Sequence, residues 1–454
     1  MLSIGWASQD MTPQRPAMIQ GQKHRRIGYQ AMDALTVTAL AIENADLTDS
    51  AILISCDLAY VSDELLKGVL RRLARRLPSV SGEKVVMAAT HTHTSLVIED
   101  GFYSQPDGDV MTPQECETWV ADVAAQAAVA AWENRTPRHV GRAFGHAVVG
   151  HNRYALYTHG HAQMYGATHR SDFSTIGGYE DHSVDMLLTW DVDGTPAGVA
   201  IAIPCPSQVD EGLQVFSADF WHDIRLELCQ RYKKPLEVLA LCSAAGDQSP
   251  HLLLYHREEA EMRKRRGITE RREIAIRVAD AVDRALECTP PSAEDTDFAH
   301  VTRHIQLAPI CITQEQRDWA EVELEKCQTS GDLSSWWPQR LRQVVKIFDG
   351  QHPQKPFPAE LHILRIGNAV FATNPFELFL DYSLQMKATS PAAQTFIIQL
   401  AGRGWYLPTE RALKAGGYGA NPVVCQVGPV GGRQLVEETL KSIGQLFESQ
   451  CESL

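Results

Sequence analysis

The fold class is decided by the stretch Met186-Leu-Leu-Thr-Trp-Asp-Val192, then Asp193-Gly194, then Ala197-Gly-Val-Ala-Ile-Ala-Ile203. Two apolar runs flank an Asp-Gly pair, which favours a hairpin because glycine adopts positive φ without steric cost. A second pair of runs, Leu361–Ile366 and Ala369–Ala372, is separated by Gly367-Asn368 and predicts another hairpin. Hairpins join antiparallel strands, so we predict mixed sheets and not purely parallel ones.

Helical and strand patterns alternate along the rest of the chain. Gln114–Glu133 has apolar residues at i, i+3 and i+4, the spacing of one helix face. The other expected helices are Glu64–Leu77, Asp219–Tyr232, Arg271–Glu287, Gln314–Cys327, Gln339–Ile347, Phe376–Lys387 and Gly432–Phe447. The other expected strands are Leu35–Ala45, Ala51–Cys56, Lys84–Ala89 and Leu236–Leu241. The alternation predicts an α/β protein.

Composition excludes several classes of protein. The chain has 454 residues, of which 44% are hydrophobic and 22% charged, as in ordinary globular proteins. Lys and Arg total 42 against 56 Asp and Glu, and this charge of −14 argues against a nucleic-acid partner. The longest apolar runs, Ala127–Trp132 and Val199–Ile203, fall far short of the roughly 20 residues of a membrane helix. We expect neither nucleic acid nor a transmembrane segment.

The N-terminus and the cysteines indicate the compartment. Met1-Leu2-Ser3-Ile4-Gly5-Trp6 has no basic region and no apolar stretch typical of a signal peptide. The ten cysteines are scattered and form no CxxC motif. Reduced thiols and a cytoplasmic location are therefore expected.

Two histidine pairs are candidates for chemistry. His91 and His93, in Thr90–Ser95, follow an apolar strand, and residues i and i+2 on a strand share a face. Neutral imidazole is the commonest metal ligand, although two structural histidines would show the same pattern. His159 and His161 lie in a His-rich stretch with no strand before it, which favours a polar loop at a pocket over a metal site.

Three further motifs have both structural and functional interpretations. Gly246–Pro250 can present the Ser249 hydroxyl at a strand end, although a plain turn fits the pattern better. Asn374–Glu377 is expected to open a helix, where the helix dipole favours a glutamate. Gly404–Thr409 and Gly416–Tyr418 are glycine-rich aromatic loops, which are surface connections or line substrate sites.

The order of the motifs resembles a known family over nearly the whole chain. The motifs are Asp10-Met11-Thr12-Pro13, Asp57, His91-Thr92-His93-Thr94-Ser95, Asn152-Arg153, Ser217-Ala218-Asp219, Gly246-Asp247-Gln248-Ser249-Pro250, Asn374-Pro375-Phe376-Glu377, Tyr406-x-x-Thr409 and Gly417-Tyr418. This set is similar to the catalytic domain of the neutral/alkaline (non-lysosomal) ceramidase family.

The resemblance implies a zinc-dependent amidase. Its zinc ligands are two His, one Glu and one Tyr, and His91, Glu377 and Tyr406 match three of them. Phe376 and Pro408 depart from the family's Gly and Thr beside these ligands. The resemblance also implies catalytic or substrate-contacting roles for four residues: His93, Arg153, Ser249 and Tyr418.

One departure affects the metal site. Cys205, in Ile203-Pro204-Cys205-Pro206, stands where the family has its second zinc histidine. A thiolate is a good zinc ligand, so a set of His91, Cys205, Glu377 and Tyr406 is chemically reasonable. The alternative is a site that has lost a ligand and is poor in metal, or one completed by His159 or His161.

The combined expectation is a zinc-dependent hydrolase that cleaves the C–N bond of an N-acyl amide through metal-activated water. We expect one domain, residues 1–454, with two mixed sheets packed face to face and helices outside, an αββα-like arrangement. Secreted relatives carry a further C-terminal β domain and a signal that are not recognised here, so a small soluble substrate is expected. An ester or lactone hydrolase and a non-catalytic relative with a decayed site remain alternatives, and a homo-oligomer remains open.

Overall fold

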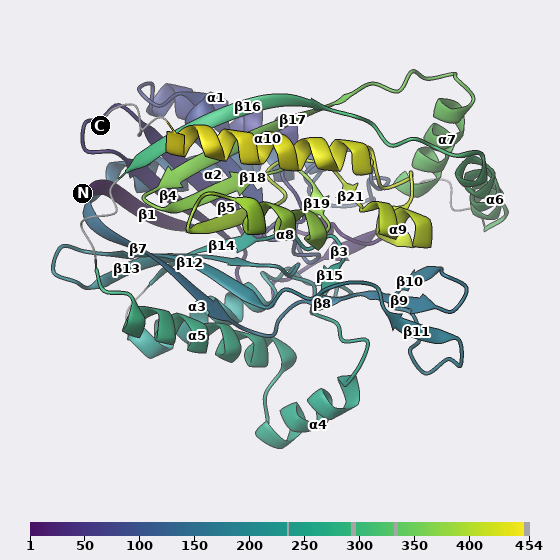
Figure 1. Cartoon of the computed structure of the whole chain (residues 1–454), viewed down its shortest axis with the longest axis horizontal. Helices are drawn as coiled ribbons and strands as arrows, with labels where there is room; N and C mark the ends of the chain where they lie inside the picture. The colour runs from purple at the N-terminus through teal and green to yellow at the C-terminus, as the bar shows by residue number, and fades with distance from the viewer. Residues whose placement is uncertain (234–235, 292–296, 331–334, 449–454) are drawn as a thin grey trace.

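Two mixed β-sheets form the centre of the molecule (Figure 1). The structure is a computed structural model that describes residues 1–233, 236–291, 297–330 and 335–448. The larger sheet has eight strands, in the order β14 (Glu237–Cys242), β13 (Pro196–Ile203), β12 (Ser183–Trp190), β7 (Thr136–His146), β1 (Leu2–Asp10), β4 (Thr36–Glu43), β5 (Ser50–Cys56) and β6 (Val85–Ala89). Neighbours are antiparallel except for the parallel pairs β13/β14 and β5/β6.

The two predicted hairpins are confirmed. β12 and β13 pair antiparallel, and their turn has Gly194 at φ +84° and a hydrogen bond from Asp191 N to Thr195 O of 2.8 Å. The smaller sheet contains the second hairpin, with Gly367 at φ +57°. Its strands run in the order β16 (Phe298–Leu307), β17 (Phe357–Ile366), β18 (Ala369–Thr373) and β20 (Gln394–Ile398), with β18 and β20 parallel.

The two sheets pack face to face, as expected. Leu40 and Leu241 of the larger sheet share one buried cluster with Phe371 and Phe396 of the smaller sheet. The rings of Phe371 and Phe396 stack with centroids 4.2 Å apart. This apolar layer holds the sheets together because each buries one face of alternating side chains against the other.

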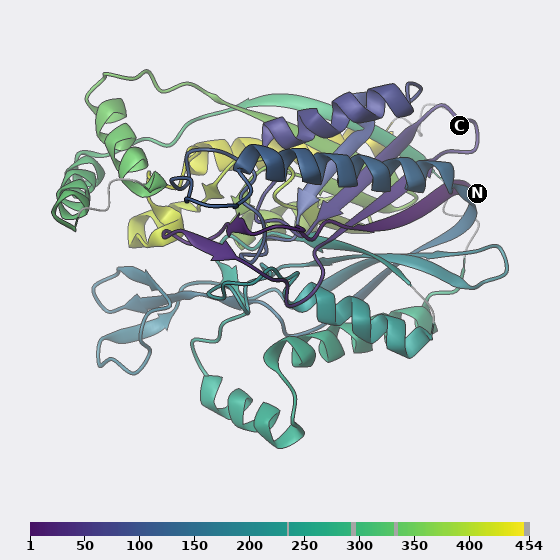
Figure 2. The same ribbon diagram turned by 180° about the vertical axis from the view of Figure 1, so that it is seen from behind.

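Helices cover both outer faces, which completes the αββα arrangement. The larger sheet is covered by α1 (Asp63–Arg76) and α2 (Pro113–Glu133), seen from behind in Figure 2, and by α3 (Phe220–Tyr232) and α5 (Glu270–Cys288). The smaller sheet is covered by α8 (Leu380–Thr389) and α10 (Pro429–Glu448). α7 (Trp336–Phe348) lies at one end of the molecule, where it packs on α6 (Gln314–Ser330) (Figure 1). None of the helices in the described ranges has both the length and the apolar character needed to cross a membrane.

The remaining strands and helices lie outside the two sheets and the helices that cover them. They are β2 (Ala17–Ile19), β3 (Arg26–Gly28), β8 (His151–Asn152), β9 (Tyr154–Tyr157), β10 (Ala162–Met164), β11 (Phe173–Ile176), β15 (Gln248–Ser249), α4 (His256–Arg266), α6 (Gln314–Ser330), β19 (Glu377–Leu378), β21 (Tyr406–Leu407) and α9 (Glu410–Ala415). Two single 3-10 turns, Gly82–Lys84 and Tyr418–Ala420, complete the set.

One expected element is wrong in a way that matters for the site. The helix expected from Phe376 begins at Leu380, and Glu377 lies in the short strand β19. β19 pairs in parallel with β21, with Glu377 directly opposite Tyr406. Pairing between segments that are distant in sequence overrides the local helix-start signal, and it sets these two side chains next to each other.

Candidate active site

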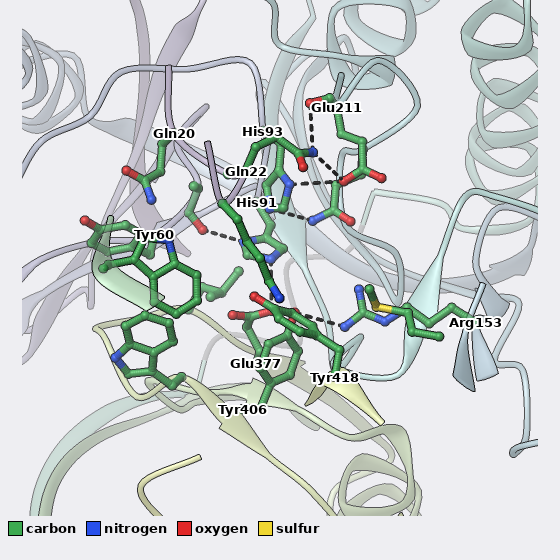
Figure 3. A pocket seen from close by; sticks show the side chains of 18 of the residues that line it. Gln20, Gln22, Tyr60, His91, His93, Arg153, Glu211, Glu377, Tyr406 and Tyr418 are labelled. Atoms are coloured by element: carbon green, nitrogen blue, oxygen red, sulfur yellow. Dashed lines mark hydrogen bonds and ion pairs between the residues drawn. The ribbon is translucent and has the colours of Figure 1, made fainter. Parts of the chain in front are cut away.

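A cavity of about 730 Å³ opens where several strands end. The parallel pairs of the fold direct their carboxyl ends to this region, the usual place for functional loops in α/β sheets. His91 and His93 follow β6, Gln208 and Glu211 follow β13, and Glu377 follows β18. Figure 3 shows these side chains, except that of Gln208, pointing toward one another with Arg153, Tyr406 and Tyr418.

His91 lies at the centre of this group in an unusual backbone conformation. It follows β6, as expected, and has φ +63°, a left-handed value that residues other than glycine rarely adopt. Its Nδ1–H donates to the carbonyl oxygen of Ala59 at 2.5 Å, and its Nε2 lies 3.1 Å from Oε2 of Glu377. Since Nδ1–H is committed to Ala59, either a proton or a metal cation between Nε2 and the carboxylate would satisfy both groups.

Glu377 and Tyr406 form the other half of the group. Cross-strand pairing holds them together, and Nη2 of Arg153 donates to the Tyr406 hydroxyl at 2.9 Å and to Gly246 O at 2.8 Å. Burial alone would raise the pKa of Glu377, but His91, Tyr406 and Arg153 together outweigh it, and the net pKa is lowered. Burial raises the pKa of Tyr406 well above its ordinary value, against the opposing influence of Arg153. The centre therefore holds an ionised carboxylate beside a buried phenol.

These residues fit a zinc ion in donor chemistry. An imidazole nitrogen, a carboxylate and a Tyr oxygen converge, and a backbone carbonyl orients the His91 ring in the manner of metal-binding histidines. The 3.1 Å between His91 Nε2 and Glu377 Oε2 is close to the edge of a tetrahedron with bonds of about 2.0–2.1 Å, which is about 3.3 Å. In the described ranges no group of three or more His, Cys, Asp and Glu side chains is arranged to hold a metal ion, so a metal site here would need the Tyr406 hydroxyl as its third donor.

His93 is held on both ring nitrogens. Its Nδ1 lies 3.2 Å from Oε2 of Glu211, and its Nε2 lies 2.8 Å from the amide nitrogen of Gln208. The amide can only donate, so Nε2 accepts and Nδ1–H donates to the carboxylate. Burial lowers the pKa of His93 and keeps the ring neutral. The rings of His91 and His93 lie 4.9 Å apart, so the expected convergence of the pair is observed in the pocket.

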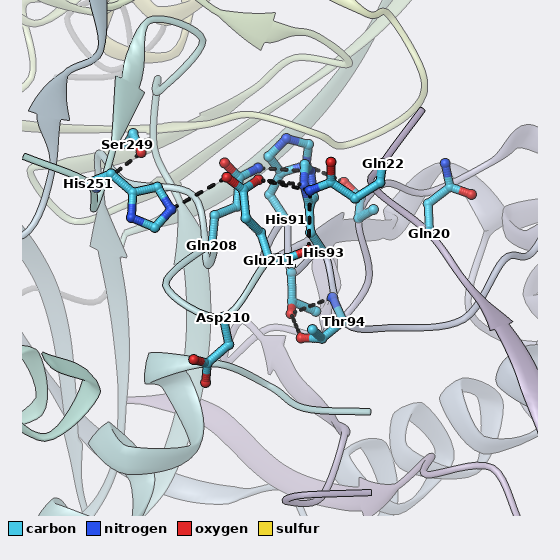
Figure 4. A network of polar contacts seen from close by, with 12 residues as sticks. Gln20, Gln22, His91, His93, Thr94, Gln208, Asp210, Glu211, Ser249 and His251 are labelled. Carbon is cyan, nitrogen blue, oxygen red and sulfur yellow. Dashed lines mark hydrogen bonds and ion pairs between the residues drawn. The ribbon is translucent and has the colours of Figure 1, made fainter. Parts of the chain in front are cut away.

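A polar network extends from His93 behind the pocket wall (Figure 4). The second oxygen of Glu211 lies 3.4 Å from Nε2 of His251. Burial opposes ionisation of Glu211, but the two histidines outweigh it and lower its pKa. Ser249 is fully buried, and its Oγ lies 3.0 Å from the hydroxyl of Tyr165, which lines the cavity. Ser249 thus contacts the site through Tyr165 and does not itself line it.

Tyr418 connects the polar centre to an aromatic wall. Its ring meets Tyr406 edge to face at 5.8 Å and stacks on Trp337 at 6.2 Å. Beyond it the cavity is lined by rings that contact one another: Tyr60, Phe102, Trp336 and Trp405. One end of the cavity is therefore polar and the other is aromatic.

Cys205 is not brought to this group. Its side chain is fully buried in the core beneath α3 and α5, and it does not line the cavity. Its Sγ lies 3.4 Å from Pro206 O and 3.7 Å from Val149 O, and burial raises the pKa of the thiol well above its ordinary value. His159 and His161 are exposed in the turn between β9 and β10 and do not line the cavity either. The structure thus assembles three of the four expected ligands.

Several pocket residues escaped the sequence reasoning. The loop between β2 and β3 contributes Gln20–His24 to the cavity, and Gly21, at φ +117°, packs directly on the His93 ring. Buried Arg26 donates to four carbonyl oxygens, including those of His93 at 2.6 Å and Glu211 at 2.7 Å. The basic run Lys23–Arg26 in an acidic chain is the one signal that could have marked this loop.

Comparisons with known proteins place the fold. The structure matches that of neutral ceramidase from Pseudomonas aeruginosa with a TM-score of 0.69 and 16% identity, over 97% of this chain and 73% of that one. It also matches a structure described as ceramidase complexed with C2, with a TM-score of 0.71 and 15% identity, over 99% of this chain and 75% of that one. A scan against protein-family models and a search of curated proteins found no match. The chain therefore has the ceramidase fold, as the resemblance implied.

Proposed function

We propose that this protein is a zinc-dependent hydrolase that cleaves the C–N bond of an N-acyl amide. The observation that carries the proposal is the group of His91, Glu377 and Tyr406 in a cavity of about 730 Å³, with His91 Nε2 3.1 Å from the Glu377 carboxylate. The fold shared with two ceramidase structures supports amide chemistry over other hydrolytic reactions.

The zinc ion would be held by His91, Glu377 and Tyr406. Three protein ligands with a further position for water or substrate are the usual composition of a catalytic zinc site. A bound zinc supplies Lewis-acid chemistry, since it acidifies water and polarises a carbonyl group. Cys205 is left out of this ligand set because its thiol lies in the core.

His93 would move the proton. Its Nδ1–H is held by Glu211, so the Nε2 lone pair is the free basic position once Gln208 turns aside. In hydrolysis Nε2 accepts a proton from the attacking water and then passes it to the leaving nitrogen. The Glu211 carboxylate stabilises the imidazolium that exists between these two steps, as a carboxylate does beside a catalytic histidine.

Arg153 and Tyr418 would bind the carbonyl oxygen as it gains negative charge. Arg153 is a buried cation whose Nε has no hydrogen-bond partner in the described part of the chain. Tyr418 lines the cavity next to Tyr406, and burial raises the pKa of its phenol, which keeps it a proton donor. Donors fixed in a site that excludes water stabilise an oxyanion strongly. Ser249 would act through Tyr165 by fixing its orientation.

The size of the cavity supports a small substrate. Cavities of about 300–1,000 Å³ are typical for drug-sized ligands, and this one falls within that range. We therefore propose a small soluble amide over a ceramide-like lipid. An ester or lactone would be attacked by the same groups, so matched amide and ester pairs must be assayed together.

Metal content and hydrolysis test the proposal. The purified protein should contain about one zinc per chain by elemental analysis, and Glu377→Ala should lose both the metal and hydrolysis of short N-acyl amides. Glu360→Ala is the control, since that half-buried glutamate pairs with His362 and does not line the cavity. A protein that takes up no zinc in any preparation would support the non-catalytic alternative. If the protein hydrolyses esters but not the matched amides, it is an ester hydrolase and the amide assignment is wrong.

A further inference from the structure

The loop between β2 and β3 spans the length of the cavity. At Gly21 it touches the His93 ring, and two residues later Lys23 reaches the aromatic end. Lys23 and His24 both line the cavity, and they belong to a basic run in a chain with a net charge of −14. The loop therefore brings positive charge to the end of the pocket that lies away from His91 and Glu377.

The Lys23 ammonium is held by aromatic rings and not by a carboxylate. Its Nζ lies 3.6 Å from the centroid of Trp337 and 5.1 Å from that of Tyr418. An ammonium over a ring face keeps its hydrogen-bond donors free, because a cation–π contact is with the π electrons. Lys23 as a residue remains exposed, so its charged end can be reached from the cavity.

The other cations of the cavity are already neutralised or bonded. Arg403 pairs with Glu99, and Arg153 donates to Tyr406 and Gly246. Glu323 acts on Lys23 only at longer range, since its carboxylate pairs with Lys326 at 2.6 Å. Within the described residues, no carboxylate forms an ion pair with Lys23. Partial burial of the ammonium among the rings lowers the pKa of Lys23, a cost that an anion placed there would offset.

The aromatic residues that line the cavity near Lys23 indicate which chemical group of a ligand would lie next to the ammonium. Trp336, Trp405 and Phe102 contact one another along this side, with ring centroids 5.3 to 6.4 Å apart. Such a surface favours a flat apolar group. The Tyr418 ring then lies between this end and the Tyr406 of the polar centre.

We propose that Lys23 and Trp337 form a subsite for a carboxylate, so that the substrate is an N-acyl amide with an aromatic or flat apolar body and an anionic far end. This inference rests on the proposed function, which supplies the amide end of the molecule. It places the selectivity for substrate in the loop between β2 and β3 and in α7.

The test is a matched pair of ligands that cannot be hydrolysed. We choose 4-(methanesulfonamido)phenylacetate and the corresponding uncharged alcohol, 2-[4-(methanesulfonamido)phenyl]ethanol. Neither contains an amide or ester bond, because the sulfonamide replaces the scissile amide. Calorimetric titration of the purified protein should give a dissociation constant about tenfold lower for the carboxylate, a difference of about 1.4 kcal/mol. In Lys23→Met the ratio of the two constants should fall to about one, whereas Lys23→Arg should retain most of it.

Lys67→Met is the matched control, because it removes one positive charge from an exposed site on α1 that does not line the cavity. Its ratio should stay near tenfold. Equal affinity of the wild-type protein for the two ligands would overturn the subsite. If the ratio of the two dissociation constants also falls to about one in Lys67→Met, the subsite would be overturned, because the net charge of the protein would then explain the preference for the carboxylate. Since these ligands are not cleaved, binding can succeed while hydrolysis fails, which separates this inference from the proposed function.

Discussion

Two histidine pairs in this molecule have opposite surroundings. His91 and His93 have ring centroids 4.9 Å apart, and His300 and His362 have centroids 5.2 Å apart. The first pair faces the cavity, and neither His300 nor His362 lines it. His300 lies on β16 and His362 on β17, where their ring nitrogens contact each other at 3.0 Å. Proximity of two imidazoles thus does not distinguish a functional site from a structural one.

The partners of each pair make the distinction. Glu377 and Glu211 reach the pocket pair from 286 and 118 residues away, and each presents a carboxylate next to empty volume. The second pair is closed on all sides by the neighbouring strands: Lys84 donates to His300 O, Asp49 accepts from His300 N, and Glu360 contacts His362. A histidine that faces a cavity can bind a ligand through its ring nitrogen, whereas a histidine enclosed by protein can only stabilise the sheet.

The largest expected effect comes from removing the Glu377 carboxylate, which contacts His91 of the first pair. We expect Glu377→Gln to lower kcat/KM by about 10³-fold or more, because it removes one of the three proposed zinc ligands. Hydrolysis and zinc content should fall together. Glu360→Gln, the equivalent change at the second pair, should leave both within about twofold. Retention of zinc and activity in Glu377→Gln would remove the distinction between the pairs.

Glu211→Gln should have the next largest effect. The neutral amide no longer stabilises the imidazolium of His93, so we expect kcat to fall by roughly 10²-fold with little change in KM. Steady-state kinetics would measure this split. Zinc content should not change, because Glu211 contacts His93 and not the three ligands. A rise in KM alone would assign Glu211 to substrate binding.

The second pair should control stability toward acid. Burial, with the neighbouring His362 and Lys84, lowers the pKa of His300 to about 3, against about 6.5 for an unfolded histidine. The unfolded state therefore binds a proton between these values and the folded state does not, so stability is lost as the pH falls. From pH 6.5 to pH 5 this group alone should lower the free energy of unfolding by about 1.6 kcal/mol. Urea titrations of the wild-type protein and of His300→Gln measure the difference in slope.

His304→Gln provides the comparison for that experiment. His304 is exposed on the same strand, so the variant should keep the wild-type dependence of stability on pH. If His300→Gln also kept it, His300 would titrate normally and the assignment of this pair to stability would be wrong.

Gly21→Ala should produce the smallest of these effects at the first pair. A Cβ at position 21 would overlap the His93 ring, and φ +117° is strained for alanine. We expect displacement of the ring and about a tenfold loss of kcat/KM, or about 1.4 kcal/mol. Gly101→Ala has a similar positive φ of +91° with no atom nearby, so it isolates the backbone strain. Equal losses in the two variants would show that contact with His93 is not the cause.

Several expectations remain predictions. These are a single catalytic domain over residues 1–454, a cytoplasmic location, the absence of a nucleic-acid partner and the oligomeric state. Zinc and the substrate belong to the proposal. The αββα fold is confirmed, and its physical basis is the pair of sheets whose inner faces meet in one apolar layer.

The amino-acid sequence by itself determined the features that depend on neighbouring residues. Asp193-Gly194 specified a hairpin because a positive φ at glycine closes the turn, and the spacing of alanine and valine in Pro113–Glu133 specified a helix with a buried face. It also marked His91, Glu377 and Tyr406 as a candidate set through the resemblance of short motifs.

Only the tertiary structure decided which side chains meet. Asn374–Glu377 carries a helix-start signal, but Glu377 pairs with Tyr406 in a short parallel sheet instead. Cys205 lies in the core, although its position in the chain suggested a metal ligand. Glu211 and Gly21 reached His93 without any local pattern. Local signals report the conformation of a few adjacent residues, whereas these contacts join segments up to 286 residues apart, and their formation depends on packing of the two sheets.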